Sequence, residues 1–154
     1  MAMLTAHERS LLRSNRRAVL ATISPDGRPR LVPICFVLDP ERPVIYTPID
    51  DKPKRVDDPG DLARVRDIVA DPRVSVLVDR WDEDWTRLAW LRCHGFGALL
   101  EPAAADGLDA PERAPIIVAL RAKYPQYEAH GLETRPLIRI EIERVTSWGL
   151  PDPA

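Results

Sequence analysis

The sequence is poor in cysteine and has no long apolar run, and these shortages exclude several kinds of protein. Its two cysteines, Cys35 and Cys93, lie in apolar stretches without CxxC spacing, so we expect neither a disulfide nor a zinc site. No apolar run approaches the roughly 18 residues of a membrane-spanning helix, which argues against a membrane protein. Residues 1–17 carry polar side chains throughout and have no apolar region like that of a signal peptide, so we expect a cytoplasmic location.

The chain also has little net charge, few lysines and no glycine-rich phosphate loop. A net charge of −2 argues against a nucleic-acid-binding protein, which needs clustered Lys and Arg. Neither GxGxxG nor GxxxxGK occurs, so a phosphate site would have to be built from side chains. Lys52, Lys54 and Lys123 are the only lysines among 22 basic residues, and the first two lie close together. The three histidines are scattered, so we expect no metal site and no histidine-based catalysis.

Length and helix signals predict one domain of the α+β class. At 154 residues the chain has the size of a single domain, and we expect residues 1–154 to form it. Thr5 and Glu8 have the spacing of a capping box, which predicts a short helix ending near Ser14. Apolar residues at helical spacing predict a second helix over Asp61–Ala70, with an aspartate cap, and prolines open a third over Pro111–Lys123.

The remaining ordered segments have the composition of strands. Six strands are predicted, over Arg17–Ser24, Arg28–Leu38, Val44–Thr47, Val74–Asp79, Leu88–Leu100 and Leu137–Trp148. Pro25-Asp26-Gly27 is a turn signal that makes the first two a hairpin. Gly95 and Gly97 lie inside a predicted strand, which is typical of a bulge or a tight barrel corner. Antiparallel connections between six strands predict a small closed or partly closed barrel with peripheral helices.

Several short motifs follow one another in an order that resembles a known family. They are Ala21-Thr22-Ile23-Ser24, Asp26-Gly27-Arg28-Pro29, Pro33-Ile34-Cys35-Phe36, Tyr46-Thr47-Pro48-Ile49-Asp50, Lys52-Pro53-Lys54-Arg55, Asp71-Pro72-Arg73-Val74-Ser75, Val78-Asp79-Arg80-Trp81 and Gly95-Phe96-Gly97. Together they resemble the signature of the pyridoxamine-phosphate-oxidase-like proteins, over roughly residues 5–150. Residues 82–88 and 144–149 resemble the branch of that family described as coenzyme F420-dependent oxidoreductases.

The resemblance implies a fold, an assembly and a cofactor. The fold is the split β-barrel that binds flavin mononucleotide (FMN), and the assembly is a homodimer with two cofactor sites in grooves between the subunits. The cofactor is the deazaflavin F420 or FMN, and the activity is hydride transfer to or from a small-molecule substrate. An FMN-dependent oxidase of the pyridoxamine-phosphate type and a non-catalytic carrier of F420, flavin or haem stay open. The family has no fixed catalytic triad, so no catalytic residue is assigned.

The family places its phosphate contacts at positions that match Lys52, Lys54 and Arg55. These residues follow a predicted strand in a proline-containing segment, where their cationic groups could hold a phosphate by charge-assisted hydrogen bonds. The alternative is a solvated turn. The family also places the backbone of Pro33, Ile34 and Cys35 beside the edge of the cofactor ring, and the alternative for these three is ordinary core packing.

Two further groups of residues match family positions near the cofactor. Tyr46, Thr47 and Pro48 belong to the facing strand end, where a hydroxyl can bond to oxygens of the ring or its ribityl chain. Trp81 and Trp148 match positions that approach the cofactor from the second subunit, although an indole equally suits a subunit interface or the core. Arg80 could bind the acidic groups of a deazaflavin, and its alternative is an exposed ion pair.

Overall fold

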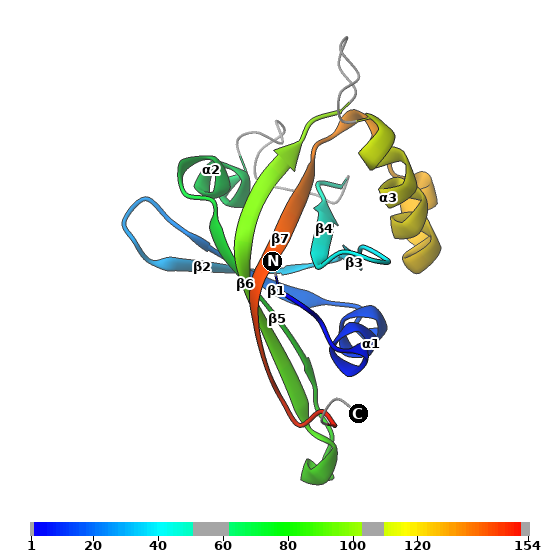
Figure 1. Cartoon of the computed structure of the whole chain (residues 1–154). Coiled ribbons are helices and arrows are strands. Elements are labelled where there is room, and N and C mark those ends of the chain that lie inside the picture. Colours follow the sequence, from blue (N-terminus) through cyan, green and yellow to red (C-terminus); the bar gives the residue numbers. More distant parts are fainter. Residues whose placement is uncertain (1, 51–61, 103–109, 152–154) are drawn as a thin grey trace.

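The computed structural model describes residues 2–50, 62–102 and 110–151, which form a curled antiparallel sheet with helices packed around it (Figure 1). The strands are β1 (Ala18–Ile23), β2 (Pro29–Ile34), β3 (Val37–Leu38), β4 (Val44–Pro48), β5 (Arg73–Arg80), β6 (Ala89–Leu100) and β7 (Leu137–Trp148). The α-helices are α1 (Ala6–Ser14), α2 (Ala63–Ala70) and α3 (Ala110–Lys123), with 3-10 turns η2 (Trp85–Arg87), η3 (Pro125–Ala129) and η4 (Leu132–Thr134). The predicted α+β class is confirmed.

The strands follow the order β2-β1-β5-β6-β7-β4-β3, and every neighbouring pair is antiparallel. The two edge strands, β2 and β3, are separated in the chain only by Cys35 and Phe36. One short crossing therefore connects the two edges, and the sheet curls into a barrel that is split at this point.

The strand count is seven rather than the predicted six, because the run over residues 28–38 divides at Cys35 and Phe36. The chain leaves β1 at Ile34 and joins β4 at Val37. The Phe36 ring is fully buried, and its backbone N–H donates to the Tyr124 hydroxyl over 3.1 Å. A tertiary contact thus replaces the strand pairing that this N–H would otherwise need.

Helix ends agree with the sequence at α1 and differ at α2. The capping box of α1 is confirmed, since the Thr5 hydroxyl accepts from the Glu8 N–H over 3.1 Å and the Glu8 carboxylate accepts from the Thr5 N–H over 2.9 Å. Helix α2 starts at Ala63 after Leu62, which offers no side-chain cap, and the predicted cap at Asp61 lies outside the described residues.

Two apolar clusters form the core. The larger fills the barrel and includes Leu20, Ile45, Val76 and Leu91, which alternate along their strands with outward residues. The smaller lies between the outer side of β4 and the helices α3 and η3, and includes Tyr46, Leu120 and Tyr127. Because both sides of β4 are covered, all five of its residues are buried.

The predicted irregularity of the long strand is confirmed at Gly95, where the register of β6 against β7 shifts. A Cβ atom at this position would lie 2.0 Å from the Glu141 carbonyl oxygen. The bulge brings the two backbones closer than any side chain allows, so only glycine fits there.

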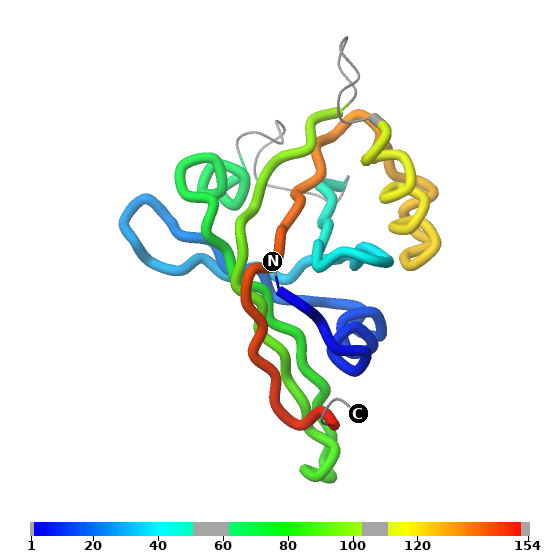
Figure 2. Tube along the Cα trace, in the orientation of Figure 1, coloured from blue at the N-terminus to red at the C-terminus, as the bar shows by residue number. Residues whose placement is uncertain are grey.

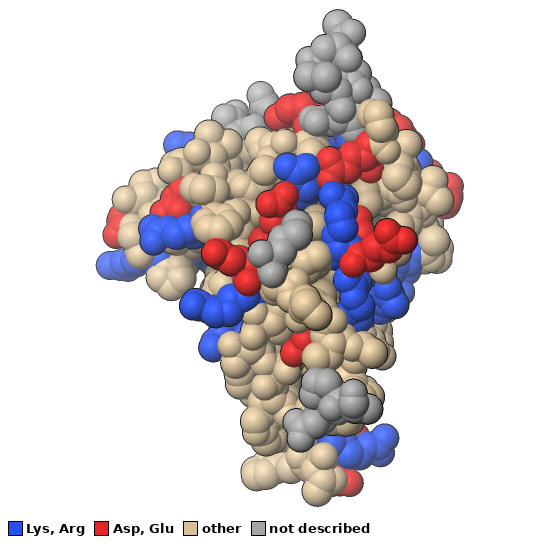
Figure 3. All heavy atoms as spheres, viewed as in Figure 1, with Lys and Arg blue, Asp and Glu red and all other residues tan. Residues whose placement is uncertain are grey.

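Beyond the bulge, β5, β6 and β7 extend as a long ribbon away from α2 and α3 (Figures 1 and 2). Charged side chains of both signs are interleaved over the body of the molecule, whereas this ribbon is mostly uncharged on the side seen in Figure 3. Exposed apolar residues on and near the ribbon include Leu77, Trp81, Trp85 and Trp148. An uncharged surface with exposed indoles is typical of a protein contact.

Candidate functional site

The break between β2 and β3 forms one wall of the candidate site. Pro33 is exposed, Ile34 is buried in the barrel core, and Cys35 is half-buried against the smaller cluster. These three predicted residues therefore point in alternating directions. β3 pairs only with Ile45 and Tyr46, so within the described chain no strand lies beside Thr47 and the following residue on that edge of β4.

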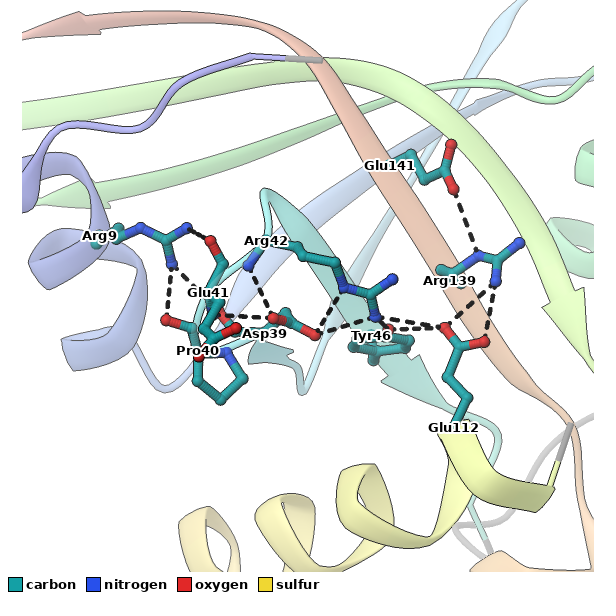
Figure 4. Close-up of polar contacts among 9 residues, drawn as sticks. All are labelled: Arg9, Asp39, Pro40, Glu41, Arg42, Tyr46, Glu112, Arg139 and Glu141. Carbon is teal, nitrogen blue, oxygen red and sulfur yellow. Dashed lines mark hydrogen bonds and ion pairs between the residues drawn. The ribbon is translucent and has the colours of Figure 1, made fainter.

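Tyr46, Thr47 and Pro48 are all buried, and the hydroxyl of Tyr46 already has two partners (Figure 4). It donates to Glu112 Oε1 over 2.8 Å and accepts from Arg42 Nη2 over 2.8 Å. Burial and the neighbouring Glu112 carboxylate raise the pKa of Tyr46. A cofactor oxygen would have to compete with these partners, and the predicted role of Tyr46 stays a prediction.

The network around Tyr46 fastens α3 to the sheet. Glu112 near the start of α3 accepts from Arg139 Nη1 of β7 over 3.0 Å, and Arg42 donates to Asp39 Oδ2 over 3.1 Å (Figure 4). Arg9 of α1 reaches the carbonyl of Glu41 over 2.7 Å in the same turn. Arg139 Nε is buried without a hydrogen-bond acceptor among the described residues, but the Arg139 guanidinium forms ion pairs with Glu112 and Glu141, so we assign this cluster a structural role.

Directly after β4 lies a second polar cluster, which the sequence analysis missed. The buried Asp50 accepts from the Tyr127 hydroxyl over 2.7 Å, and its carbonyl accepts from Arg135 Nη1 over 3.0 Å. Burial, the nearby Cys35 thiol and the Asp50 carboxylate all raise the pKa of Tyr127. Cys35, from the wall described above, and the end of β4 therefore meet at Tyr127.

Arg64 adds a cation with one buried N–H group, at Nε, that lacks a hydrogen-bond acceptor in the described part of the chain. Burial lowers the pKa of Arg64, and the charges of Asp50 and Tyr127 act in the opposite direction. A buried donor without an acceptor is costly. The position therefore suits an anionic ligand group, such as a phosphate, that would supply the missing oxygen.

Lys52, Lys54 and Arg55 lie outside the described residues. These three residues lie in the sequence between the buried Asp50 and Leu62, and Leu62 stands two positions before Arg64. Their predicted role in phosphate binding stays a prediction. The structure adds Arg64 to the candidates. The sequence held a signal for it, because Arg64 stands four residues before the buried Ile68 and therefore lies on the same face of α2.

Arg80, Trp81 and Trp148 lie at the far end of the ribbon, away from the end of β4 (Figure 1). Arg80 Nε donates to the Arg87 carbonyl over 2.7 Å, and the Trp81 indole donates to Glu83 Oε1 over 3.1 Å. Trp81 is 65% exposed and Trp148 is 53% exposed. Among the described residues, the chain therefore does not bring these three to the predicted site residues at Pro33–Cys35 and Tyr46–Pro48.

Residues 4–149 match the profile of the family described as pyridoxamine 5'-phosphate oxidase. The chain belongs to this family. No group of three or more His, Cys, Asp or Glu side chains suited to a metal ion occurs among the described residues, and no helix within them is long and apolar enough to cross a membrane.

Solved structures with the family's fold carry several activities. A conserved hypothetical protein of Mycobacterium tuberculosis shares 23% identity and a TM-score of 0.70, over 100% of this chain and 92% of that one. An F420 reductase shares 19% identity and a TM-score of 0.63, over 94% and 98% of the two chains. The haem storage protein HutZ of Vibrio cholerae shares 17% identity and a TM-score of 0.65, over 96% of each. These likenesses support the split-barrel fold of the pyridoxamine 5'-phosphate oxidase family.

Proposed function

We propose that this chain is a coenzyme F420-dependent oxidoreductase, which transfers a hydride between the deazaflavin and a small-molecule substrate. Membership of the family and the fold shared with an F420 reductase support a redox cofactor. The observation that carries an anionic cofactor is the buried Nε of Arg64, which has no acceptor in the described chain and belongs to a guanidinium that interacts with the charge of Asp50, directly after β4. The segment with Lys52, Lys54 and Arg55 begins at the same end.

In this proposal the protein contributes binding, orientation and exclusion of water. Lys52, Lys54, Arg55 and Arg64 would hold the phosphate of the cofactor, whose ring, once bound, supplies the carbon that gives or receives the hydride. The backbone at Pro33–Cys35 would border the ring. Tyr127 keeps its proton, because its surroundings raise the pKa, and its bond to Asp50 fixes the polypeptide at the start of the phosphate-binding segment.

A second copy of the chain would complete the site. Trp81 and Trp148 are exposed at the end of the ribbon, and the indole faces could cover the cofactor groove of the partner and shield it from water. We therefore propose a homodimer in which each ribbon reaches the other subunit's site.

If the ribbon forms the dimer interface, a single charge introduced there should convert the dimer to a monomer. Leu77 is 42% exposed in the middle of β5, and Leu77→Glu would bury a carboxylate in the interface without a partner. Light scattering at micromolar concentration should give a dimer mass for the native protein and a monomer mass for this variant. Val69→Glu on α2, where the side chain is 71% exposed, is the matched control and should stay dimeric. A native monomer would contradict the assembly.

The cofactor site predicts opposite responses of binding and stability to one substitution. Arg64→Met removes a poorly solvated charge that has no acceptor, so the stability of the cofactor-free protein should stay the same or rise slightly. Cofactor affinity should fall about tenfold or more, as expected for one charge-assisted hydrogen bond. Binding titrations and urea unfolding measure the two effects, with the exposed Arg66→Met as control. Unchanged affinity would remove Arg64 from the site.

A second candidate function is cofactor binding without F420 chemistry. The fold shared with a haem storage protein, and membership of a family named for pyridoxamine 5'-phosphate oxidase, favour a haem or FMN protein as the alternatives. The purified protein distinguishes them by its spectrum: tightly bound flavin gives a yellow protein and haem gives a Soret band, whereas the F420 proposal requires uptake of added deazaflavin.

A further inference from the structure

Two cations lie against the ring of Tyr124 at the split of the barrel. Arg16 precedes β1, and its guanidinium carbon lies 4.7 Å from the centre of the Tyr124 ring. Lys123 is the last residue of α3, and its Nζ lies 5.4 Å from the same ring centre and 3.9 Å from that of Phe36. The Tyr124 hydroxyl donates to the Arg16 carbonyl over 2.9 Å and accepts from the Phe36 N–H over 3.1 Å, so the Tyr124 ring is held against the backbone at both places.

No carboxylate of the described chain neutralises this pair. Arg30, Arg73 and Arg121 each have a carboxylate within 4 Å, whereas neither Arg16 nor Lys123 forms an ion pair there. Burial and the charge of Arg16 lower the pKa of Lys123 to about 8, and the Cys35 thiol acts weakly in the opposite direction. The two like charges repel each other, and no described residue accepts a hydrogen bond from either side chain.

We propose that Arg16 and Lys123 form a binding site for a phosphate or carboxylate group, with the rings of Tyr124 and Phe36 as its apolar walls. An anion that accepts hydrogen bonds from both side chains would relieve the repulsion between the two cations. Cation–π contact uses the ring faces and leaves the N–H groups of the cations open to such a ligand. Neither cation is among the residues assigned to the cofactor.

The position also indicates which ligand the anion belongs to. Phe36 follows Cys35 in the chain, and Pro33–Cys35 are proposed to border the cofactor ring. An anion held here would lie beside that ring, where a substrate binds, so the substrate class is a small molecule with a phosphate or carboxylate group. This last step rests on the proposed function, whereas the anion site itself does not.

The three lysines make the test direct, because selective carbon labelling of lysine gives one ε-carbon signal for each. Lys123→Gln assigns the Lys123 signal. The intact cofactor-free protein is titrated with inorganic phosphate and, separately, with benzoate, against chloride at equal ionic strength. We expect a saturable shift of the Lys123 signal at millimolar anion, and a Lys123 titration midpoint that moves from about 8 toward the ordinary value near 10.4.

Phosphate and benzoate distinguish a phosphate ligand from a carboxylate ligand, and a shift of the Lys123 signal with either anion supports the site. Arg16→Gln should weaken the response about tenfold or more, while Arg28→Gln, at the far turn of the β1–β2 hairpin, removes the same charge and should leave it unchanged. Lack of any Lys123 response to both anions would overturn the proposal. A phosphate response confined to Lys52 and Lys54 would also overturn it, and would leave the cofactor proposal standing.

Discussion

Gly95→Ala should lower the free energy of unfolding by about 3 kcal/mol or more, which is a large part of the stability of a small domain. The added Cβ would lie 2.0 Å from the carbonyl oxygen of Glu141 and 2.9 Å from its carbon, and both are backbone atoms of the facing strand. Neither strand can move without disturbing the longest pairing in the sheet, β6 with β7.

Gly97→Ala is the matched control for this prediction. Its Cβ would lie 3.2 Å from the Ile68 side chain, which can change rotamer, so we expect a loss of about 1 kcal/mol or less. Urea unfolding of both variants measures the difference. If both variants lost the same free energy of unfolding, the cost would come from replacing any glycine in this strand, and not from the bulge at His94 and Gly95.

Arg113→Met should cost about 3 kcal/mol or more, because four backbone carbonyls, those of Leu100, Leu132, Glu133 and Arg135, would lose a donor inside the protein. Arg113 is 3% exposed, and its guanidinium donates to the carbonyls of Leu100 over 2.7 Å, Arg135 over 2.8 Å and Leu132 over 3.2 Å. It thereby joins α3 to the end of β6 and to the turn η4. Methionine matches its length but satisfies none of these oxygens.

The same variant should also weaken cofactor binding. Arg135 donates to the Asp50 carbonyl over 3.0 Å, so loss of Arg113 should loosen Asp50, which precedes the segment proposed to bind phosphate. Val118→Ala is the control, since this side chain is 68% exposed on α3 and its loss should change stability by less than about 0.5 kcal/mol. An unchanged free energy of unfolding in Arg113→Met would contradict this structural role of the guanidinium.

Local signals in the sequence predicted most of the fold. The capping box at Thr5 and Glu8 and the alternation in residues 137–148 depend on neighbouring residues, and both are confirmed. The division of residues 28–38 into two strands was not predictable in this way. It depends on the Tyr124 hydroxyl, 88 residues further along the chain, which accepts from the N–H of Phe36.

The candidate site was predictable in part for the same reason. The scarcity of lysine and the family motifs pointed to Lys52 and Lys54, and their role in the site stays a prediction. The meeting of Asp50 with Tyr127 and of Arg16 with Lys123 depends on how η3 and α3 pack on the split of the barrel. Such contacts between distant segments carry no local pattern.

The most direct test of the central claim is a fluorescence titration of the purified protein with F420 and, separately, with FMN, repeated for a Lys52→Ala/Lys54→Ala variant. The account predicts saturable binding of F420 that is tighter than that of FMN, and a loss of about tenfold or more in the variant with unchanged thermal stability. A preference for FMN, or F420 binding that ignores the two lysines, would contradict it.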